Sequence, residues 1–255
     1  MKRTVIFIFF IIFSFSLSGN SMKDSAIVYI QQGNEAYQSN NFEEAIALYT
    51  QAIDLQFESA MLFYNLGNAY FKNGDNARAL LWLERAKRLD PNNEDIIHNI
   101  SFIQQKLIDR IEHLPELFIV KLWNKCSGFF TGNQWATLSI ILSALFALCL
   151  FFILLIKIQW VRTIATIVAI FALFFTIFTI IFAKKESTRH IKHPKGIIMS
   201  HVVNAKSTPN EKGFDLFVIH LGLKVEITDH LNEWVEIKLP NGEKGWILVN
   251  HIEEI

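Results

Sequence analysis

The chain has 255 residues, of which 51% are hydrophobic and 19% are charged, and its formal net charge is zero. A balanced charge excludes the global basic field of a typical nucleic-acid-binding protein, so we expect no nucleic-acid partner. The apolar residues, which include 23 phenylalanines, gather in three blocks, as in membrane proteins. The composition therefore predicts a multidomain membrane protein rather than one globule.

Residues 1–19 have the pattern of a secretory signal peptide. Lys2 and Arg3 precede an apolar run from Val5 to Leu17, and small residues follow that run. The run is too short to span a bilayer comfortably. We therefore predict export of the chain that follows, with an uncleaved N-terminal anchor as the alternative.

A 34-residue repeat lies between about Ser25 and Pro91. A period of this length predicts pairs of helices stacked as a solenoid, in which small residues mark the helix crossings. We predict a helical domain over 25–113, with repeats at 26–59 and 60–93 and a capping helix at 94–113. The residues expected to hold this structure are Gly33, Ala45, Ala52, Gly67, Ala79, Ala86 and Pro91.

The run from Phe63 to Tyr70, together with Ala79, Ala86 and Pro91, is similar to a tetratricopeptide repeat (TPR). The resemblance implies all-α helical repeats and a groove, formed chiefly by the first helix of each repeat, that binds partner proteins. The matching positions are Ile30, Asn34, Tyr37, Tyr64, Asn68, Phe71, Lys72, His98 and Phe102.

Paired asparagines in this groove suit an extended backbone, because an amide side chain both donates and accepts hydrogen bonds. Ile30 and Tyr64 stand where a chaperone-type carboxylate clamp needs basic residues, so we do not predict binding of a chaperone tail. The alternative for Tyr64 and Phe71 is that both pack against the capping helix.

Two uncharged segments, 136–156 and 163–183, are each long enough to cross the roughly 30 Å hydrocarbon core of a bilayer. Only six residues join them, too few to cross, so we predict a two-helix transmembrane hairpin. The preceding segment, 115–134, is apolar with interspersed Lys121 and Lys125, which suits a juxtamembrane interfacial helix lying on the membrane. Packing of this segment against the helical repeats is the alternative.

A hairpin returns the chain to the side that it left, so the domains before and after it face one compartment. The signal places them outside the cytoplasmic (inner) membrane, in the periplasm. The basic linker at 184–194, with Lys184, Lys185 and Lys192, instead favours the cytoplasm by the positive-inside rule. We follow the signal, because basic residues there can also belong to a segment that contacts lipid.

Residues 195–255 alternate in polarity from Trp234 to Leu239 and turn at Asn241-Gly242, which predicts short strands in a small all-β barrel. The combination of Trp234, Gly242, Gly245 and Trp246 is similar to bacterial SH3 (SH3b) domains, so an SH3-like fold is implied. These four residues are structural or ligand-binding candidates, and for the two tryptophans we expect the barrel core rather than a ligand platform.

The sequence contains none of the common catalytic motifs, such as a nucleophile elbow or a phosphate-binding Walker loop. His190 and His193 are three residues apart, but they lie among cationic residues that disfavour a divalent metal. We therefore expect neither an enzyme nor a metal or cofactor site.

The order of signal, TPR, transmembrane hairpin and SH3-like domain resembles the BatE-like TPR proteins of the Bacteroides aerotolerance operon. This resemblance implies a noncatalytic scaffold or adaptor in a cell-envelope complex of Bacteroidetes. Its implied partners, besides the membrane lipid bilayer, are other envelope proteins such as von Willebrand A-type membrane proteins of the same operon. The alternative is an anchor that binds peptidoglycan, the cell wall, through the SH3-like domain.

Overall fold

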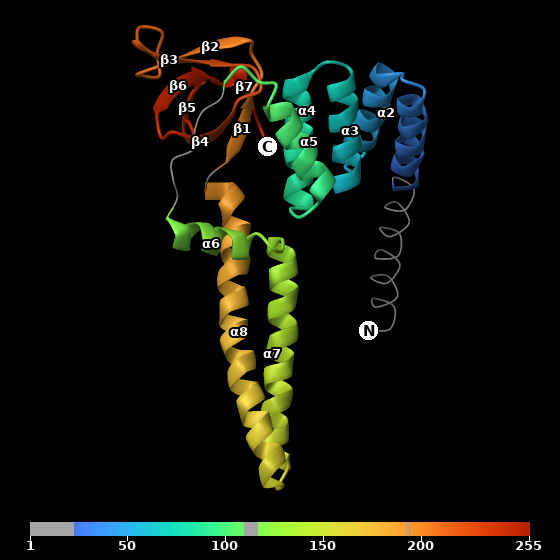
Figure 1. Ribbon diagram of the computed structural model, residues 1–255, viewed down its shortest axis with the longest axis vertical. Helices are drawn as coiled ribbons and strands as arrows, with labels where there is room; N and C mark the ends of the chain where they lie inside the picture. Colours follow the sequence, from blue (N-terminus) through green and yellow to red (C-terminus); the bar gives the residue numbers. More distant parts are fainter. Residues whose placement is uncertain (1–22, 110–116, 193) are drawn as a thin grey trace, which may run out of the picture.

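The computed structural model describes residues 23–109, 117–192 and 194–255, without the side chains of residues 189–192. Figure 1 shows an array of helices, an antiparallel sheet domain beside it and two long helices that project from them. We call the first two parts the head and the two long helices, α7 and α8, the stalk. The predicted signal at 1–19 lies outside the described residues.

The helical array consists of two helix pairs and one further helix. Its first helix is described from residue 23 to residue 38. The others are α2 (Phe42–Asp54), α3 (Ala60–Lys72), α4 (Asn76–Leu89) and α5 (Glu94–Gln104).

The turns of the two pairs share their geometry. Asn40 and Gly74, which are 34 residues apart, have positive φ angles of 60° and 89° after the first helix of each pair. A left-handed residue at this position ends a helix and lets the chain reverse. Asn93 caps α5, because its side chain accepts a hydrogen bond from the backbone N–H of Ile96.

Small residues bring the helices of each pair together. A Cβ on Gly67 would lie 2.8 Å from Cγ of Leu83 and 3.1 Å from the carbonyl oxygen of Ala79, and a Cβ on Gly33 would lie 2.6 Å from the Tyr49 ring. Larger residues at these two glycines would therefore push the helices apart. The four alanines of the repeat are fully buried in the core of the array: Ala45, Ala52, Ala79 and Ala86.

The sheet domain has seven antiparallel strands in the order β3-β2-β6-β5-β4-β1-β7. Alternate side chains such as Val235, Ile237 and Ile247 point inward and form its buried core. The strands are β1 (Lys195–Ile198), β2 (Val202–Lys206), β3 (Asp215–His220), β4 (Lys224–Leu231), β5 (Trp234–Lys238), β6 (Lys244–Leu248) and β7 (Ile252–Glu254).

The chain leaves the helical array earlier than the sequence predicts. α5 ends at Gln104, whereas we predicted a capping helix to residue 113, of which residues 110–113 lie outside the described residues. Beyond α5, Leu107 packs closely on Gly222. A Cβ on Gly222 would lie 2.7 Å from Cδ2 of Leu107. Asp109 accepts hydrogen bonds from the backbone N–H and the ring of His220. These contacts with the sheet domain take the place of further helical turns.

α4 packs directly against the sheet domain. Nζ of Lys224 lies 2.5 Å from Oε2 of Glu84, whose side chain is only 7% exposed. Ile197 of β1 is fully buried together with the core of the helical array. Arg85 and Arg88 donate hydrogen bonds to the backbone oxygens of Glu254 and Ile255, so α4 covers the β7 edge of the sheet. The two parts of the head therefore pack as one unit.

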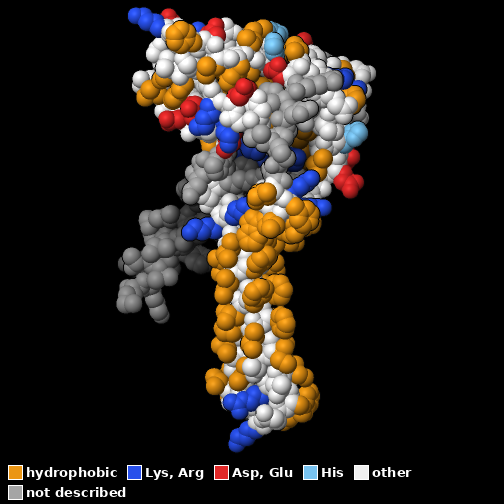
Figure 2. All heavy atoms as spheres, turned by 60° about the vertical axis from the view of Figure 1, so that its left-hand side comes forward, with side chains coloured by type: hydrophobic (Ala, Val, Ile, Leu, Met, Phe, Trp, Pro, Cys, Tyr) orange, Lys and Arg blue, Asp and Glu red, His pale blue; other side chains and the backbone are white. Residues whose placement is uncertain are grey.

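The stalk consists of α7 (Gly132–Leu155) and α8 (Gln159–Lys192), which pack along each other and are joined by residues 156–158. Both helices are long and apolar enough to cross a membrane. They begin four residues before the predicted segments 136–156 and 163–183, and α8 continues through residues 184–192, where we expected a linker. Figure 2 shows apolar side chains covering the stalk and basic side chains at its free tip.

A short helix, α6 (Phe118–Ser127), lies across the head end of the stalk (Figure 1). It falls within the predicted interfacial segment 115–134, of which residues 115 and 116 lie outside the described residues.

Lys224→Gln tests the packing between the two parts of the head. It leaves the Glu84 carboxylate buried without its cation, and we expect a loss of roughly 2 kcal/mol in the free energy of unfolding. The loss is smaller than for a fully buried pair, because Lys224 is itself 28% exposed. Urea denaturation of the full chain in detergent measures it. Lys212→Gln, at an exposed lysine of the β2–β3 loop, is the control, and equal effects of the two substitutions would contradict the role of the pair.

Candidate partner-binding site in the helical repeats

Four asparagines form a repeating polar contact between successive helix pairs. Oδ1 of Asn34 accepts a hydrogen bond of 3.0 Å from Nδ2 of Asn65, which lies on α3. One repeat later, Oδ1 of Asn68 accepts a hydrogen bond of 2.8 Å from Nδ2 of Asn99 on α5. We call these four residues the asparagine ladder. It links the first helix, α3 and α5, which are the helices expected to form the groove.

One end of the ladder lines a pocket of about 200 Å³. The residues around it are Asn34, Tyr37, Gln38, Tyr49, Asn65 and Asn68. None of these side chains carries a formal charge at neutral pH. The pocket therefore offers hydrogen-bonding groups without an ion to select for or against.

The hydrogen bonds of the pocket leave amide groups unused. Oδ1 of Asn34 accepts from the Tyr49 hydroxyl at 2.8 Å as well as from Asn65. Within the described residues, the Nδ2 groups of Asn34 and Asn68 donate no hydrogen bond, although each has two N–H donors. Amide donors of this kind match the carbonyl oxygens of an extended peptide, which are regularly spaced acceptors.

Burial keeps the hydroxyls of this pocket protonated. It raises the pKa of Tyr49 to about 12, and the neighbouring Tyr37 adds to the effect. The pKa of Tyr37 is also raised, first by burial and then by Tyr64. The pocket therefore stays neutral well above physiological pH.

Three of the predicted groove residues contact a neighbouring helix rather than an open groove. Tyr64 and Phe71 lie on α3 and contact α5, and Phe102 lies on α5 and contacts α3. The Tyr64 hydroxyl accepts a hydrogen bond of 3.3 Å from Asn99 of α5. The rings of Phe71 and Phe102 lie 5.8 Å apart, edge to face, and Nζ of Lys106 lies over both. Packing of Tyr64 and Phe71 against the third helix was the alternative left open by the sequence, and the structure favours it.

The other predicted groove residues do not join the pocket. Ile30 is half-buried and packs against the core of the array. Lys72 and His98 are exposed, and neither side chain has a hydrogen bond or ion pair within the part of the chain that the structure describes. Sequence reasoning missed Asn65 and Asn99, although their spacing of 34 residues, the same as that of Asn34 and Asn68, was a usable signal.

The sheet domain holds the remaining candidates. Trp234 and Trp246 are partly buried on its outer face and do not belong to its buried core, where we expected them. Gly242, with a φ of 93°, forms the turn between β5 and β6. Gly245 faces inward, where a Cβ would lie 2.9 Å from that of Ala205.

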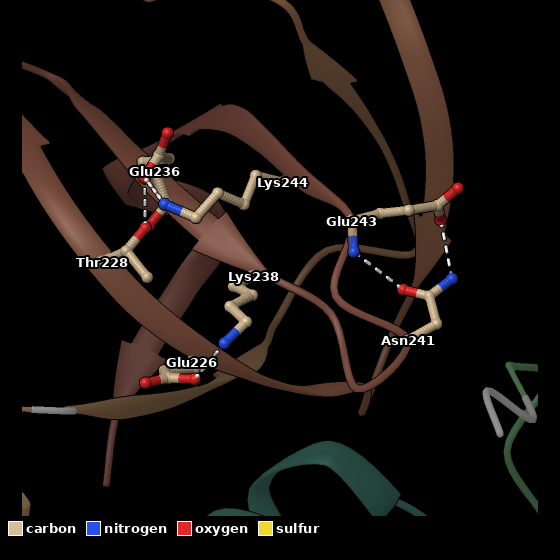
Figure 3. Close-up of polar contacts among 7 residues, drawn as sticks. All are labelled: Glu226, Thr228, Glu236, Lys238, Asn241, Glu243 and Lys244. Carbon is tan, nitrogen blue, oxygen red and sulfur yellow. Dashed lines mark hydrogen bonds and ion pairs between the residues drawn. The ribbon is translucent and has the colours of Figure 1, made fainter. Parts of the chain in front are cut away.

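Polar contacts bind the strands together on this outer face (Figure 3). Glu236 on β5 accepts hydrogen bonds from Lys244 on β6, at 2.8 Å, and from Thr228 on β4. Both bonds lower the pKa of the Glu236 carboxyl, and the bond from Lys244 has the larger effect. On the same face, Nζ of Lys238 lies 3.6 Å from Oε2 of Glu226. The two tryptophans therefore lie on a face whose other side chains are largely paired.

Within the described residues, no group of three or more His, Cys, Asp or Glu side chains is arranged to hold a metal ion.

Residues 30–94 match the tetratricopeptide repeat family, so this part of the helical array consists of TPR-like repeats. The chain is 28% identical over 95 residues to the photosystem I assembly protein Ycf3 of Acaryochloris marina, covering 36% of this chain and 57% of that protein. It is 30% identical over 81 residues to the anaphase-promoting complex subunit 3 of Schizosaccharomyces pombe, covering 32% of this chain and 12% of that protein. The chain thus spans about half the length of the Ycf3 relatives that it matches.

Among solved structures, the chain is similar to the first TPR of Spaghetti (RPAP3) bound to an HSP90 peptide. The identity is 21% and the TM-score 0.23, with 34% of this chain and 96% of that chain covered. It is also similar to NlpC2 from Trichomonas vaginalis, with 21% identity, a TM-score of 0.23 and 25% of each chain covered.

Tyr49→Phe tests the burial of the pocket hydroxyl. The unfolded chain loses the Tyr49 proton near pH 10, whereas the folded chain loses it only near pH 12, so Tyr49 stabilises the fold less and less as pH rises through this window. We expect the stability of Tyr49→Phe to fall less steeply between these pH values than that of the wild type. Thermal unfolding of the full chain in detergent at a series of pH values measures this. Parallel curves would contradict the burial of the hydroxyl.

Proposed function

We propose that the chain is a noncatalytic, membrane-anchored adaptor that binds an extended segment of a partner protein through the pocket at the end of the asparagine ladder. The observation that carries this proposal is the neutral pocket, lined by asparagine and tyrosine side chains with unused amide donors. Such a lining suits peptide backbone better than a charged tail. The tetratricopeptide repeats support a role in protein–protein interaction.

The comparisons and the architecture support a place in an assembly. One matched relative is named as an assembly protein and another as a subunit of a complex. The resemblance to the BatE-like proteins suggests von Willebrand A-type membrane proteins of an aerotolerance operon as partners in a cell-envelope complex. We propose that the stalk spans the inner membrane after signal cleavage and that the head, including an SH3-like sheet domain, lies in the periplasm.

Asn34→Ala combined with Asn68→Ala tests partner binding. Each substitution removes amide donors facing the bound segment, and at about 1 kcal/mol for each lost hydrogen bond we expect at least tenfold weaker binding. Pulldown of the intact chain from detergent-solubilised native membranes measures partner recovery.

The control for this experiment is Asn73→Ala, at an exposed asparagine beyond α3 that does not line the pocket. Circular dichroism of each variant checks that the repeats remain folded. Unchanged partner recovery by a folded double variant would sink the proposal that the pocket binds the partner.

A second candidate function is anchoring to peptidoglycan through the sheet domain. The observation that favours it is the position of Trp234 and Trp246 on the outer face of the sheet rather than in its core, because aromatic side chains commonly line ligand sites. This function needs the head on the outer side of the inner membrane.

Two measurements test this candidate in sequence. Protease added to spheroplasts should digest the head, and complete protection would contradict the periplasmic placement and wall binding together. The intact chain in detergent should then co-sediment with purified sacculi, and Trp234→Ala with Trp246→Ala should reduce the sedimented fraction severalfold. If the wild type does not sediment, the adaptor function alone stands.

A further inference from the structure

α6 exposes large apolar side chains where the stalk meets the head. Phe118 and Ile119 are 77% and 78% exposed, and Leu122 is 50% exposed. Phe118 and Leu122 are four residues apart and therefore share one side of the helix, which Ile119 extends. An apolar surface of this kind is unfavourable in water and indicates a partner that is itself apolar.

Aromatic contacts hold α6 against the stalk through Trp123, which lies about 140° around the helix from Phe118. The Trp123 ring lies 4.9 Å from the Phe182 ring and 5.8 Å from the Phe178 ring of α8. Trp135 of α7 is buried in the same cluster, and its Nε1 donates a hydrogen bond of 2.9 Å to the carbonyl oxygen of Ser127. α6 is therefore fixed to the stalk by its Trp123 side, and its Phe118 side points away.

The height of α6 along the stalk is also defined. Phe182 is nearly the last apolar residue of α8 before Lys184 and Lys185. Nζ of Lys185 donates hydrogen bonds of 2.8 Å to Oδ1 of Asn124 and 3.1 Å to the Ser127 hydroxyl, both on α6. α6 thus lies where the apolar surface of the stalk ends and charged residues begin.

Two lysines border the apolar side of α6. At about 100° per residue, Lys121 and Lys125 fall together, next to Phe118 and Leu122. Both are exposed, and neither forms an ion pair with another residue in the described ranges. Long basic side chains at the edge of an apolar surface place their stems in the hydrocarbon boundary and their ammonium groups at the level of lipid phosphates.

We propose that α6 is a membrane-surface foot, whose Phe118 and Leu122 side inserts into the lipid interface while Lys121 and Lys125 bind the phosphates of anionic lipid headgroups. The foot fixes the height of the head above the bilayer, because Nδ2 of Asn92 in the helical array donates a hydrogen bond of 2.6 Å to the carbonyl oxygen of Phe129, just beyond α6. This inference rests on the proposed membrane anchoring by the stalk. Packing of α6 on the repeats, the alternative expected from the sequence, does not account for the exposure of Phe118 and Ile119.

Site-specific fluorescence tests the insertion of the foot. The full chain, with Cys126→Ala and Cys149→Ala, is reconstituted in vesicles and carries one environment-sensitive label at a time. Phe118→Cys probes the foot and Ile170→Cys the middle of α8. Phe214→Cys on the β2–β3 loop is the matched control. The side chain of Phe214 is 82% exposed, close to the 77% of Phe118.

We expect the labels at 118 and 170 to emit at shorter wavelength and to be quenched by lipids with brominated chains, and the label at 214 to do neither. If the label at 118 behaves like that at 214 while the label at 170 is quenched, the foot is refuted and the anchoring stands. If the label at 170 also remains in water, the proposed anchoring fails and the foot with it.

Lipid charge tests the role of the lysines. Replacing phosphatidylcholine vesicles with vesicles that also contain phosphatidylglycerol should raise the ratio of inserted to water-exposed label at 118 by about thirtyfold, the contribution expected of two lysines at an anionic surface. Lys121→Gln with Lys125→Gln should abolish this increase, and Lys157→Gln with Arg162→Gln, at the far tip of the stalk, should preserve it. Equal insertion in both vesicles, or an increase that survives the Lys121 and Lys125 substitutions, would overturn the assignment of headgroup phosphates.

Discussion

The architecture depends on the connection between the two stalk helices. α7 ends at Leu155 and α8 begins at Gln159, so three residues reverse the direction of the chain. At the length of an extended residue, this connection reaches only about 10 Å, whereas either helix is more than three times as long. The chain must therefore return along α7, and the helical array and the sheet domain come to lie at the same end of the stalk.

The sheet domain and the asparagine ladder occupy different surfaces of the repeats. The sheet domain packs on α4, the second helix of the second repeat, through Lys224 and the backbone of β7. The asparagine ladder lies on the first helices of the repeats, and no residue of the sheet domain lines the pocket at its end. Docking the sheet therefore closes one of its own edges without occupying the pocket.

Local patterns made much of this fold predictable. The spacing of Gly33 and Gly67 reflects helix crossings that leave no room for a Cβ, and such contacts recur with the repeat. The early end of α5 could not be read in the same way, because Leu107 and Asp109 find their partners at Gly222 and His220, more than a hundred residues along the chain. Trp234 was misjudged for another reason. Alternation shows that it and Val235 lie on opposite faces, but only the folded sheet shows which face is the core.

The site was predictable to a smaller degree. Asn34 and Asn68 were found from their position in the repeat, whereas Asn65 and Asn99 were missed because they act through side-chain contacts between repeats. Tyr64 and Phe71 hold the same repeat positions as Ile30 and Tyr37, and they contact Asn99 and Phe102 of α5. Position within a repeat thus gives the direction of a side chain, and the neighbouring helix decides whether it stays accessible.

The continuity of α8 with the sheet domain has a mechanical consequence. α8 is helical to Lys192 and β1 begins at Lys195, so a helix of 34 residues ends within a few residues of the sheet. The sheet in turn is clamped to α4. A rotation of α8 about its axis, relative to α7, would therefore rotate the whole head. The direction in which the pocket faces would then depend on how α7 and α8 pack against each other.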